Sequence, residues 1–346
     1  MAVRDVVAGE RSRRDVMAWG REAVEPELRA AVDTLPETLR RVAGFHFGWS
    51  DAQGRPTRAG AGKSVRSALT LLCSEAVGGT AAHATTAATS VELVHNFSLL
   101  HDDVMDGDTV RRHRPAAWRL FGVNLAILTG DALLTLALDL LTVSDRPEAR
   151  QGGRLLGAAV RELVHGQSLD LDFEHRRTVE LDQCVRMSEG KTAALLGAAS
   201  GLGALFGGGD HDQVDRLRLF GERVGLAFQF ADDLLGIWGD PEVTGKPVHS
   251  DLRSRKKSLP VAAALTSATP PGDELAALYE RPGELADAEV TRAAELVELA
   301  GGREHCRERI DALLAEGLGH LDDAAVDASA ARDLAGLAQL LARRDH

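Results

Sequence analysis

Residues 95–114 read HNFSLLHDDVMDGDTVRRHR, in which an apolar helical run is followed by aspartates and then by arginines. Asp102 and Asp106 are four residues apart, so on a helix they share one face with roughly 6 Å between their Cα atoms. Two like charges at this spacing destabilise a helix unless a cation binds between them. Mg²⁺ is held by one or two carboxylates together with phosphate oxygens, and arginine binds phosphate through a fork of N–H donors. The stretch therefore predicts a magnesium-dependent diphosphate site.

A second acidic cluster lies in residues 229–240, QFADDLLGIWGD, at the end of another apolar helical run. Its polar and small residues recur at helical intervals of three or four: Gln229, Asp232, Asp233, Gly236 and Asp240. One such cluster alone is typical of a solvated helix end. Two clusters, each followed by a basic loop, indicate a site instead. We expect the two helices to face each other, so that two acidic walls enclose one cavity.

The composition favours an all-α protein without a nucleic-acid partner. Of the 346 residues 44% are hydrophobic but only 4% are aromatic, and windows of strand-favouring residues are few. The net charge of −12 argues against nucleic-acid binding. Cys73, Cys184 and Cys306 are too widely spaced for a metal pattern or a disulfide framework, which indicates a reducing cytoplasm.

No shift in composition marks a domain boundary, so we expect a single domain over residues 1–346, with 1–14 frayed. No apolar run reaches 18 residues, so no membrane span is expected, and the apolar segments 125–141 and 191–206 are interpreted as buried core helices. Helices are predicted over 15–43, 64–76, 80–105, 119–143, 148–174, 179–188, 191–206 and 211–238, with several more up to residue 344.

Two basic segments have competing interpretations. Residues 59–64, AGAGKS, look like a nucleotide-binding loop, but the glycine that this motif requires is replaced by Thr57. We interpret Lys63 and Arg66 instead as a cationic pair at the start of a helix, where free N–H groups favour a phosphate, and a surface pair without a role is the alternative. Lys191 and Thr192 open an apolar helix, and an ordinary helix start is the alternative there.

An apolar floor is predicted below the first acidic cluster. Phe97 precedes Asp102 by five residues, which places it about 7–8 Å further back along the helix. Its ring is a candidate floor for an apolar tunnel, with Ser98 leaving room beside it. The alternative is an ordinary aromatic residue of the core.

Together these motifs resemble the trans-isoprenyl diphosphate synthases, the head-to-tail prenyltransferases, over roughly residues 60–260. The resemblance is carried by residues 62–66, 95–106, 111–112, 191–192 and 229–240, with 245–247 and 251–260. In detail it is most like geranylgeranyl diphosphate synthases. It implies a bundle of about a dozen helices around a deep central cavity, assembled as a homodimer in the cytoplasm.

The resemblance also implies roles for single residues. Mg²⁺, with three ions per site and Mn²⁺ as a substitute, would be bound by Asp102, Asp106 and Asp232, with Asp103, Asp233 and Lys191 completing the catalytic set. The allylic diphosphate would be held by Arg111, Lys191, Thr192, Gln229, Lys246 and Lys256. The diphosphate of isopentenyl diphosphate would be held by Lys63, Arg66, His95 and Arg112. With Phe97 and Ser98 as the floor, the expected product is geranylgeranyl diphosphate, and next farnesyl diphosphate.

Three features depart from the family pattern. Gly236 stands where many members have a third aspartate, and Asp240, one turn further on, is a candidate to contribute charge in its place. Ser64 and Ser67 stand where arginine and proline are common, and His113 where glycine is frequent.

Two other functions share the same expected fold. A class I terpene cyclase also ionises an allylic diphosphate, but its second metal motif usually contains Asn, Ser and Glu in spaced order, which 229–240 lacks. A non-catalytic partner subunit would tend to lose an aspartate cluster, and Gly236 is the one hint of such a loss.

Overall fold

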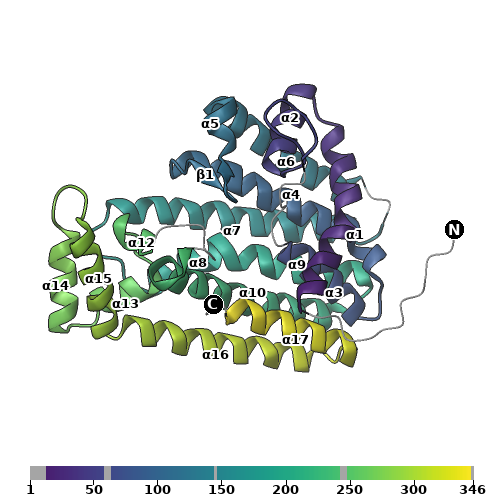
Figure 1. Ribbon diagram of the computed structural model, residues 1–346. Helices are drawn as coiled ribbons and strands as arrows, with labels where there is room; N and C mark the ends of the chain where they lie inside the picture. The colour runs from purple at the N-terminus through teal and green to yellow at the C-terminus, as the bar shows by residue number, and fades with distance from the viewer. Residues whose placement is uncertain (1–12, 58–63, 144–145, 242–247, 344–346) are drawn as a thin grey trace. The chain divides into compact units, whose positions relative to one another are not determined.

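The structure is a computed structural model that describes residues 13–57, 64–143, 146–241 and 248–343 (Figure 1). It is helical almost throughout, which confirms the predicted all-α class. Within those residues the strands are limited to β1 (Val110–Arg111) and β2 (Arg114–Pro115), which pair antiparallel. The chain divides into two compact units.

The first unit comprises residues 1–153, 199–215 and 321–337. Its helices include α1 (Arg13–Asp33), α2 (Glu37–His46), α3 (Val65–Ala76), α4 (Ala81–Met105), α5 (Ala117–Phe121) and α6 (Val123–Thr142). Helix α4 is the centre of this unit, because α1, α3 and α6 all pack against it. Leu93, Leu100 and Leu133 are fully buried in these contacts.

Glycines set the close contacts and the turn of the first unit. A Cβ atom on Gly20 would lie 2.8 Å from the Ala68 Cα atom, so glycine lets α1 approach α3. Gly78, with a φ of +86°, ends the run of α3. The Thr80 N–H then donates to Nδ1 of His83 at 3.3 Å, which satisfies a free donor at the start of α4. The predicted helices over 64–76 and 80–105 are confirmed.

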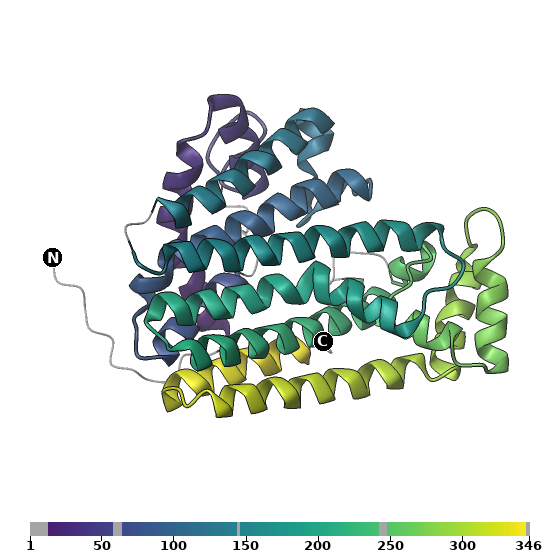
Figure 2. The same cartoon turned by 180° about the vertical axis from the view of Figure 1, so that it is seen from behind.

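The second unit comprises residues 154–198, 216–320 and 338–346. Its elements are α7 (Ala149–His175), α8 (Leu181–Ser188), η1 (Glu189–Ala193), α9 (Ala194–Gly207), α10 (His211–Trp238), α12 (Ser250–Arg253), α13 (Leu259–Leu265), α14 (Pro270–Tyr279), α15 (Asp287–Leu299), α16 (Gly302–Asp323) and α17 (Ala328–Ala342). Five of these, α7, α9, α10, α16 and α17, also give residues to the first unit. The green helices α13, α14 and α15 cluster together (Figure 2), and Ile237, Leu252 and Leu275 are buried in the core there.

Helix α6 differs from its prediction as a buried core helix. Only 33% of its most apolar window is buried, and Val123, Ile127 and Leu128 are 37–53% exposed. The prediction is therefore wrong for this face of the helix. In length and composition α6 is the one helix of the described ranges that could cross a membrane, a property that it shares with core helices of soluble proteins.

Candidate active site

The first acidic cluster stands at the carboxyl end of α4. Asp102 and Asp103 lie in its last turn, and Asp106 follows as the C-cap, with its N–H donating to the Asp102 carbonyl at 2.8 Å. The negative end of a helix dipole disfavours carboxylates, so this position favours a bound cation. Asp102 is half-buried, Asp106 is exposed, and Asp103 is buried. The two more accessible carboxylates are therefore the pair that shares one helix face.

Asp103 is engaged by Arg111. The Arg111 guanidinium donates to Oδ1 of Asp103 through Nε at 2.7 Å and also through Nη2, and its Nη2 lies 3.5 Å from Oδ2 of Asp108. Burial raises the pKa of Asp103, and the guanidinium opposes that rise. Asp103 thus fixes Arg111 beside the cluster, where the guanidinium also lies in the electrostatic field of Asp102.

Arg112 lies in a constrained turn between β1 and β2. Arg112 and His113 have φ values of +52° and +60°, a left-handed conformation that two-residue hairpin loops usually give to Asn or Gly. The next arginine anchors this hairpin: Arg114 donates to the carbonyls of Phe45 and Ser50 at 3.0 Å each. Arg114, which follows the same acidic stretch, is therefore a structural residue, whereas Arg112 extends into a pocket.

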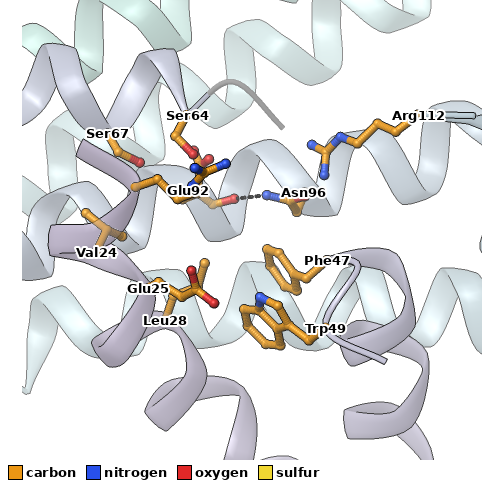
Figure 3. Close-up of a pocket in the computed structure, with 11 residues that line it drawn as sticks. Val24, Glu25, Leu28, Phe47, Trp49, Ser64, Ser67, Glu92, Asn96 and Arg112 are labelled. Carbon is orange, nitrogen blue, oxygen red and sulfur yellow. Dashed lines mark hydrogen bonds between the residues drawn. The ribbon is translucent and has the colours of Figure 1, made fainter. Parts of the chain in front are cut away.

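That pocket lies at the middle of α4 and holds about 30 Å³, room for a water molecule or two. Figure 3 shows Glu92 and Asn96 of α4 facing it, with Arg112 entering from the hairpin and Phe47 and Trp49 on the other side. Close by, Nη1 of Arg66 lies 3.3 Å from Nε2 of His95. Lys63, the fourth residue predicted for this subsite, lies outside the described residues.

Arg21 and Glu25, which also line the pocket, offset each other, and the positive excess comes from Arg66 and Arg112 beside Glu92. Burial, and then the neighbouring Arg66 and Arg112, holds the pKa of His95 well below its usual value, so this imidazole is neutral. Because a guanidinium only donates, Nε2 of His95 accepts from Arg66. The carboxyl beside the two guanidiniums is Glu92, whose pKa is raised by burial and lowered by both arginines. Glu92 was not predicted from the sequence, although it precedes His95 by three residues on the same helix face.

The second unit positions Lys191 on a π turn. Element η1 interrupts the helical run between α8 and α9, a feature often found at functional sites. A Cβ atom on Gly166 would lie 2.2 Å from the backbone nitrogen of Lys191, so α7 can approach this turn so closely only because residue 166 is glycine. The Lys191 ammonium lies 2.5 Å from Oδ2 of Asp170, also on α7. Asp170 is therefore the partner that holds this lysine.

A chain of hydrogen bonds links the other predicted residues of this unit. The Thr192 hydroxyl donates to Oε1 of Gln229 at 2.6 Å, and Nε2 of Gln229 donates to Oδ1 of Asp233 at 2.9 Å. Oδ2 of Asp233 accepts the Leu259 N–H at 3.1 Å. Burial raises the pKa of Asp233 to about 6. Both carboxylate oxygens of Asp233 are thus used within the protein, whereas Asp232 is half-exposed.

Lys256 joins the same group. Its pKa is raised against the effect of burial by Asp251, Asp233 and Asp170, and Asp170 in turn has its pKa lowered, against burial, by Lys191 and Lys256. Lys191, Thr192, Gln229, Asp233 and Lys256 are therefore brought together in the second unit. Lys246, predicted for the same subsite, lies outside the described residues.

The predicted floor residues are buried in the first unit. Phe97 is 6% exposed and packs edge-on against the His101 ring, with 4.8 Å between ring centroids. Nε2 of His101 lies 3.0 Å from the Ile127 carbonyl on α6. The Ser98 hydroxyl donates to the His95 carbonyl at 2.8 Å, so it turns back to its own helix. The Phe97 ring is thus held by the His101 ring, which is itself fixed by the Ile127 carbonyl.

The carboxylates of the first cluster fit a magnesium ion that is bound partly by the protein and partly by phosphate oxygens. Across the described ranges, no three His, Cys, Asp or Glu side chains are grouped so that they could hold a metal by themselves. Mg²⁺ does not need such a cage, because it keeps water and phosphate oxygens beside one or two carboxylates. Asp102 and Asp106 on one face of α4 provide that kind of partial site.

Comparison with known proteins places these features in context. Residues 55–297 match the family model for polyprenyl synthetase. A (2E,6E)-farnesyl diphosphate synthase of Mycobacterium tuberculosis H37Rv is 47% identical over 291 residues, which covers 83% of this chain and 81% of that protein. A geranylgeranyl diphosphate synthase of the same strain is 45% identical over 325 residues, covering 92% and 91%. The crystal structure of a polyprenyl synthetase from Streptomyces coelicolor A3(2) superposes with a TM-score of 0.91 at 42% identity, over 94% of this chain and 98% of that one.

Proposed function

Because the chain belongs to the polyprenyl synthetase family, whose members named above are transferases, we propose that it condenses isopentenyl diphosphate head-to-tail with an allylic diphosphate. One observation carries the proposal: each unit holds two buried or half-buried cations close to acidic side chains, Glu92 in the first unit and Asp170 and Asp251 in the second. The cations are Arg66 and Arg112 in the first unit and Lys191 and Lys256 in the second. Two diphosphate subsites are what a condensation of two diphosphates requires.

We propose that the two sets act across one cavity of a single domain. Asp102 and Asp106 would hold Mg²⁺ from one wall and Asp232 from the other. Arg111, Lys191, Thr192, Gln229, Lys246 and Lys256 would surround the allylic diphosphate. Lys63, Arg66, His95 and Arg112 would surround the diphosphate of isopentenyl diphosphate. Both substrates would then lie side by side, which lowers the entropic cost of their reaction.

Each group has a defined task in this mechanism. When bound, Mg²⁺ stabilises the negative charge that develops on the leaving diphosphate. Lys191 and Lys256, already oriented by Asp170 and Asp251, add fixed positive charge at that leaving group. Such terms together lower the barrier by roughly 6–10 kcal/mol. The C–O bond of the allylic substrate breaks, the isopentenyl double bond attacks the resulting allylic cation, and the released diphosphate accepts the proton lost in the last step.

The product we propose is geranylgeranyl diphosphate, with farnesyl diphosphate as the next candidate. Relatives with either name have similar identity to this chain, at 45% and 47%. Support for a short product comes from Phe97, whose buried ring is held by His101 one turn before the aspartates. An aromatic ring there would stop a growing chain at C15 to C20.

We propose that the protein is a cytoplasmic homodimer. Val123, Ile127 and Leu128 of α6 form an exposed apolar face, of the kind that a second copy buries. Leu128→Glu should halve the mass measured by light scattering, while Val164→Glu, at an exposed valine of α7, should leave it unchanged. An unchanged mass for Leu128→Glu would rule out this face.

The three cysteines are buried and free, which suits a reducing compartment.

One assay tests the reaction. Purified protein is mixed with Mg²⁺, labelled isopentenyl diphosphate and an allylic primer of five, ten or fifteen carbons, and the dephosphorylated products are separated by chromatography. We expect label in a C20 alcohol and none after EDTA treatment. A hydrocarbon without label would indicate a terpene cyclase, and no product with any primer would indicate a non-catalytic subunit.

A further inference from the structure

Glu92 is a buried carboxyl on α4 to which the proposed reaction gives no task. It is 8% exposed and faces the pocket that Arg112 enters, with Asn96 one turn further along the helix (Figure 3). Burying a carboxylate costs free energy unless cations or hydrogen-bond donors stabilise it. The charge on Glu92 therefore matters for any anion that binds close to it.

The pocket has more acceptors than donors beside Glu92. Among the described residues, Oε2 of Glu92 and Oδ1 of Asn96 are buried and have no hydrogen-bond partner. The Asn96 amide already donates to the Glu92 carbonyl at 2.8 Å, which leaves only its oxygen to pair. An ionised carboxylate and an amide oxygen can only accept, so neither satisfies the other. A proton on Glu92 would supply the missing donor, directly or through a water in the pocket.

Two guanidiniums hold Glu92 in its charged form until a ligand binds. Burial raises the pKa of Glu92, and Arg66, Arg112 and then the Ser67 hydroxyl oppose that rise. The same two arginines are proposed above to hold the diphosphate of isopentenyl diphosphate. A diphosphate that reaches them cancels their field at Glu92 and adds its own negative charge, so the effect of burial is no longer opposed.

The other groups around Glu92 keep their charge in this process. The titratable and charged residues that face it come from each neighbouring element: Arg21 and Glu25 of α1, His46 of α2, Arg66 of α3, His95 of α4 and Arg112 of the hairpin. Both histidines are neutral, because burial lowers the pKa of each one. Glu25 lies on the outer wall and accepts from Arg29 at 2.6 Å. Lys63, of the same proposed subsite, lies outside the described residues.

We propose that Glu92 takes up one proton from solvent when a diphosphate binds at Arg66 and Arg112, and that this proton sets the affinity of the subsite. The proton forms an O–H bond on the Glu92 carboxylate, and no other covalent bond changes. Neutral Glu92 no longer competes with the anion for the two guanidiniums, and it gives Asn96 a donor. Glu92 is a positioning residue, because it acts through the arginines. The inference deepens the proposed function and rests on it for the identity of the diphosphate.

The pH dependence of binding tests the proposal. Labelled isopentenyl diphosphate is bound in EDTA and measured by equilibrium dialysis above about pH 7.5, where the last ionisation of a phosphate, near about 6, is complete. A binding step that takes up a proton weakens by up to about tenfold per pH unit. We expect the Kd of the wild type to rise about threefold or more per unit. Glu92→Gln, which is always neutral, should bind more tightly at high pH and lose most of this dependence, whereas Glu92→Asp should keep it.

The proton can also be counted directly. Calorimetric titration with isopentenyl diphosphate, in buffers of different ionisation enthalpy, should show about half a proton to one proton more taken up by the wild type than by Glu92→Gln. In infrared difference spectra of the wild type, binding should produce the carbonyl band of a protonated carboxyl. That measurement needs only the wild type, so it still decides the proposal if Glu92→Gln does not fold.

Glu25→Gln is the matched control, because it removes an acid from the wall of the same pocket. It should leave the pH dependence and the proton count unchanged. Equal proton counts for the wild type and folded Glu92→Gln, no carboxyl band on binding, or an equal change in Glu25→Gln would each show that Glu92 is not the proton acceptor. A wild type that binds isopentenyl diphosphate with this proton but does not condense it would overturn the proposed function and leave the role of Glu92 standing.

Discussion

The cations of the two units differ in how their charge is balanced. In the first unit Arg66 and Arg112 face one buried carboxyl, Glu92, whose pKa is raised by burial, and His95 between them is neutral. In the second unit Lys191 lies 2.5 Å from Asp170, and Lys256 lies 4.0 Å from Asp251. The first set therefore has a positive excess. The second set has none before any ligand binds, because each lysine is paired with an aspartate and Asp232 and Asp233 add further carboxylates.

This difference predicts different requirements for binding. A positive excess in a buried pocket attracts a diphosphate by itself. The second set, whose lysines are already paired with aspartates, binds an added anion weakly unless further cations bind with it. We therefore expect isopentenyl diphosphate to bind without Mg²⁺, and the allylic diphosphate to bind only with it.

The largest effect is expected from Asp232→Asn. This substitution removes a half-exposed carboxylate of the second set that is proposed to hold Mg²⁺. Turnover should fall about 10³-fold, because the metal no longer stabilises the charge on the leaving group. Binding of labelled isopentenyl diphosphate, measured by equilibrium dialysis, should remain unchanged. Asp215→Asn, at a half-exposed acid near the start of α10, serves as the matched control. Equal loss of isopentenyl binding in Asp232→Asn would show that the two sets are not separate.

The next effect concerns the first set. Arg112→Gln should raise the KM for isopentenyl diphosphate about 10–100-fold, because a charge-assisted hydrogen bond contributes about 1.5–3 kcal/mol. Arg112→Lys should recover only part of that loss, since lysine lacks the planar fork. Lys256→Gln is the mirror experiment and should raise the KM for the allylic substrate instead. The comparison breaks if Arg112→Gln and Lys256→Gln change the same KM.

The two sets were also unequally predictable from the sequence. His95, Arg111 and Arg112 could be predicted from spacing, because helical periodicity and adjacency place them near the aspartates. Arg66, on the separate helix α3, was predicted from its place at a helix start and from the family resemblance. Asp170 could be identified only from the fold, since it reaches Lys191 through a glycine contact between α7 and η1. Periodicity describes one helix at a time and carries no information about such pairings.

The same limit applies to Gly236 and to α6. The sequence shows a missing acid at 236, but only tertiary packing brings Asp251 into that space. For α6, composition predicted burial, yet apolar residues can also form an exposed face that another chain would cover. The element type was thus predictable from residue pattern, whereas the neighbour of each face was not.

A smaller effect on turnover is expected at Phe97, which belongs to neither charged set. Phe97→Leu and Phe97→Ala remove successive parts of the ring that His101 supports, so the main product should lengthen by one or more five-carbon units in that order. The KM values of both substrates should change by less than about threefold, because no diphosphate contact is lost. Chromatography of the dephosphorylated products is the measurement. The same product distribution in all three proteins would remove Phe97 from the role of a floor.

The smallest expected effect is a contrast between the two units in how stability depends on pH. Burial raises the pKa of Asp233 to about 6, so its protonated form is favoured in the fold, and the stability it contributes falls as pH rises from about 4 to 6. Burial lowers the pKa of His46 in the first unit to about 3, so its contribution is present above about 6.5 and is lost as pH falls. In thermal melts between pH 4 and 8, the Asp233 contribution to the free energy of unfolding should fall by up to about 3 kcal/mol toward neutral pH, and Asp233→Asn should remove that fall. His46→Gln should reduce the loss of stability toward acidic pH. The change of slope is the diagnostic quantity, because either substitution also alters a hydrogen bond at every pH. Parallel curves for Asp233→Asn and the wild type would mean that Asp233 is charged over the whole range, which would contradict its raised pKa.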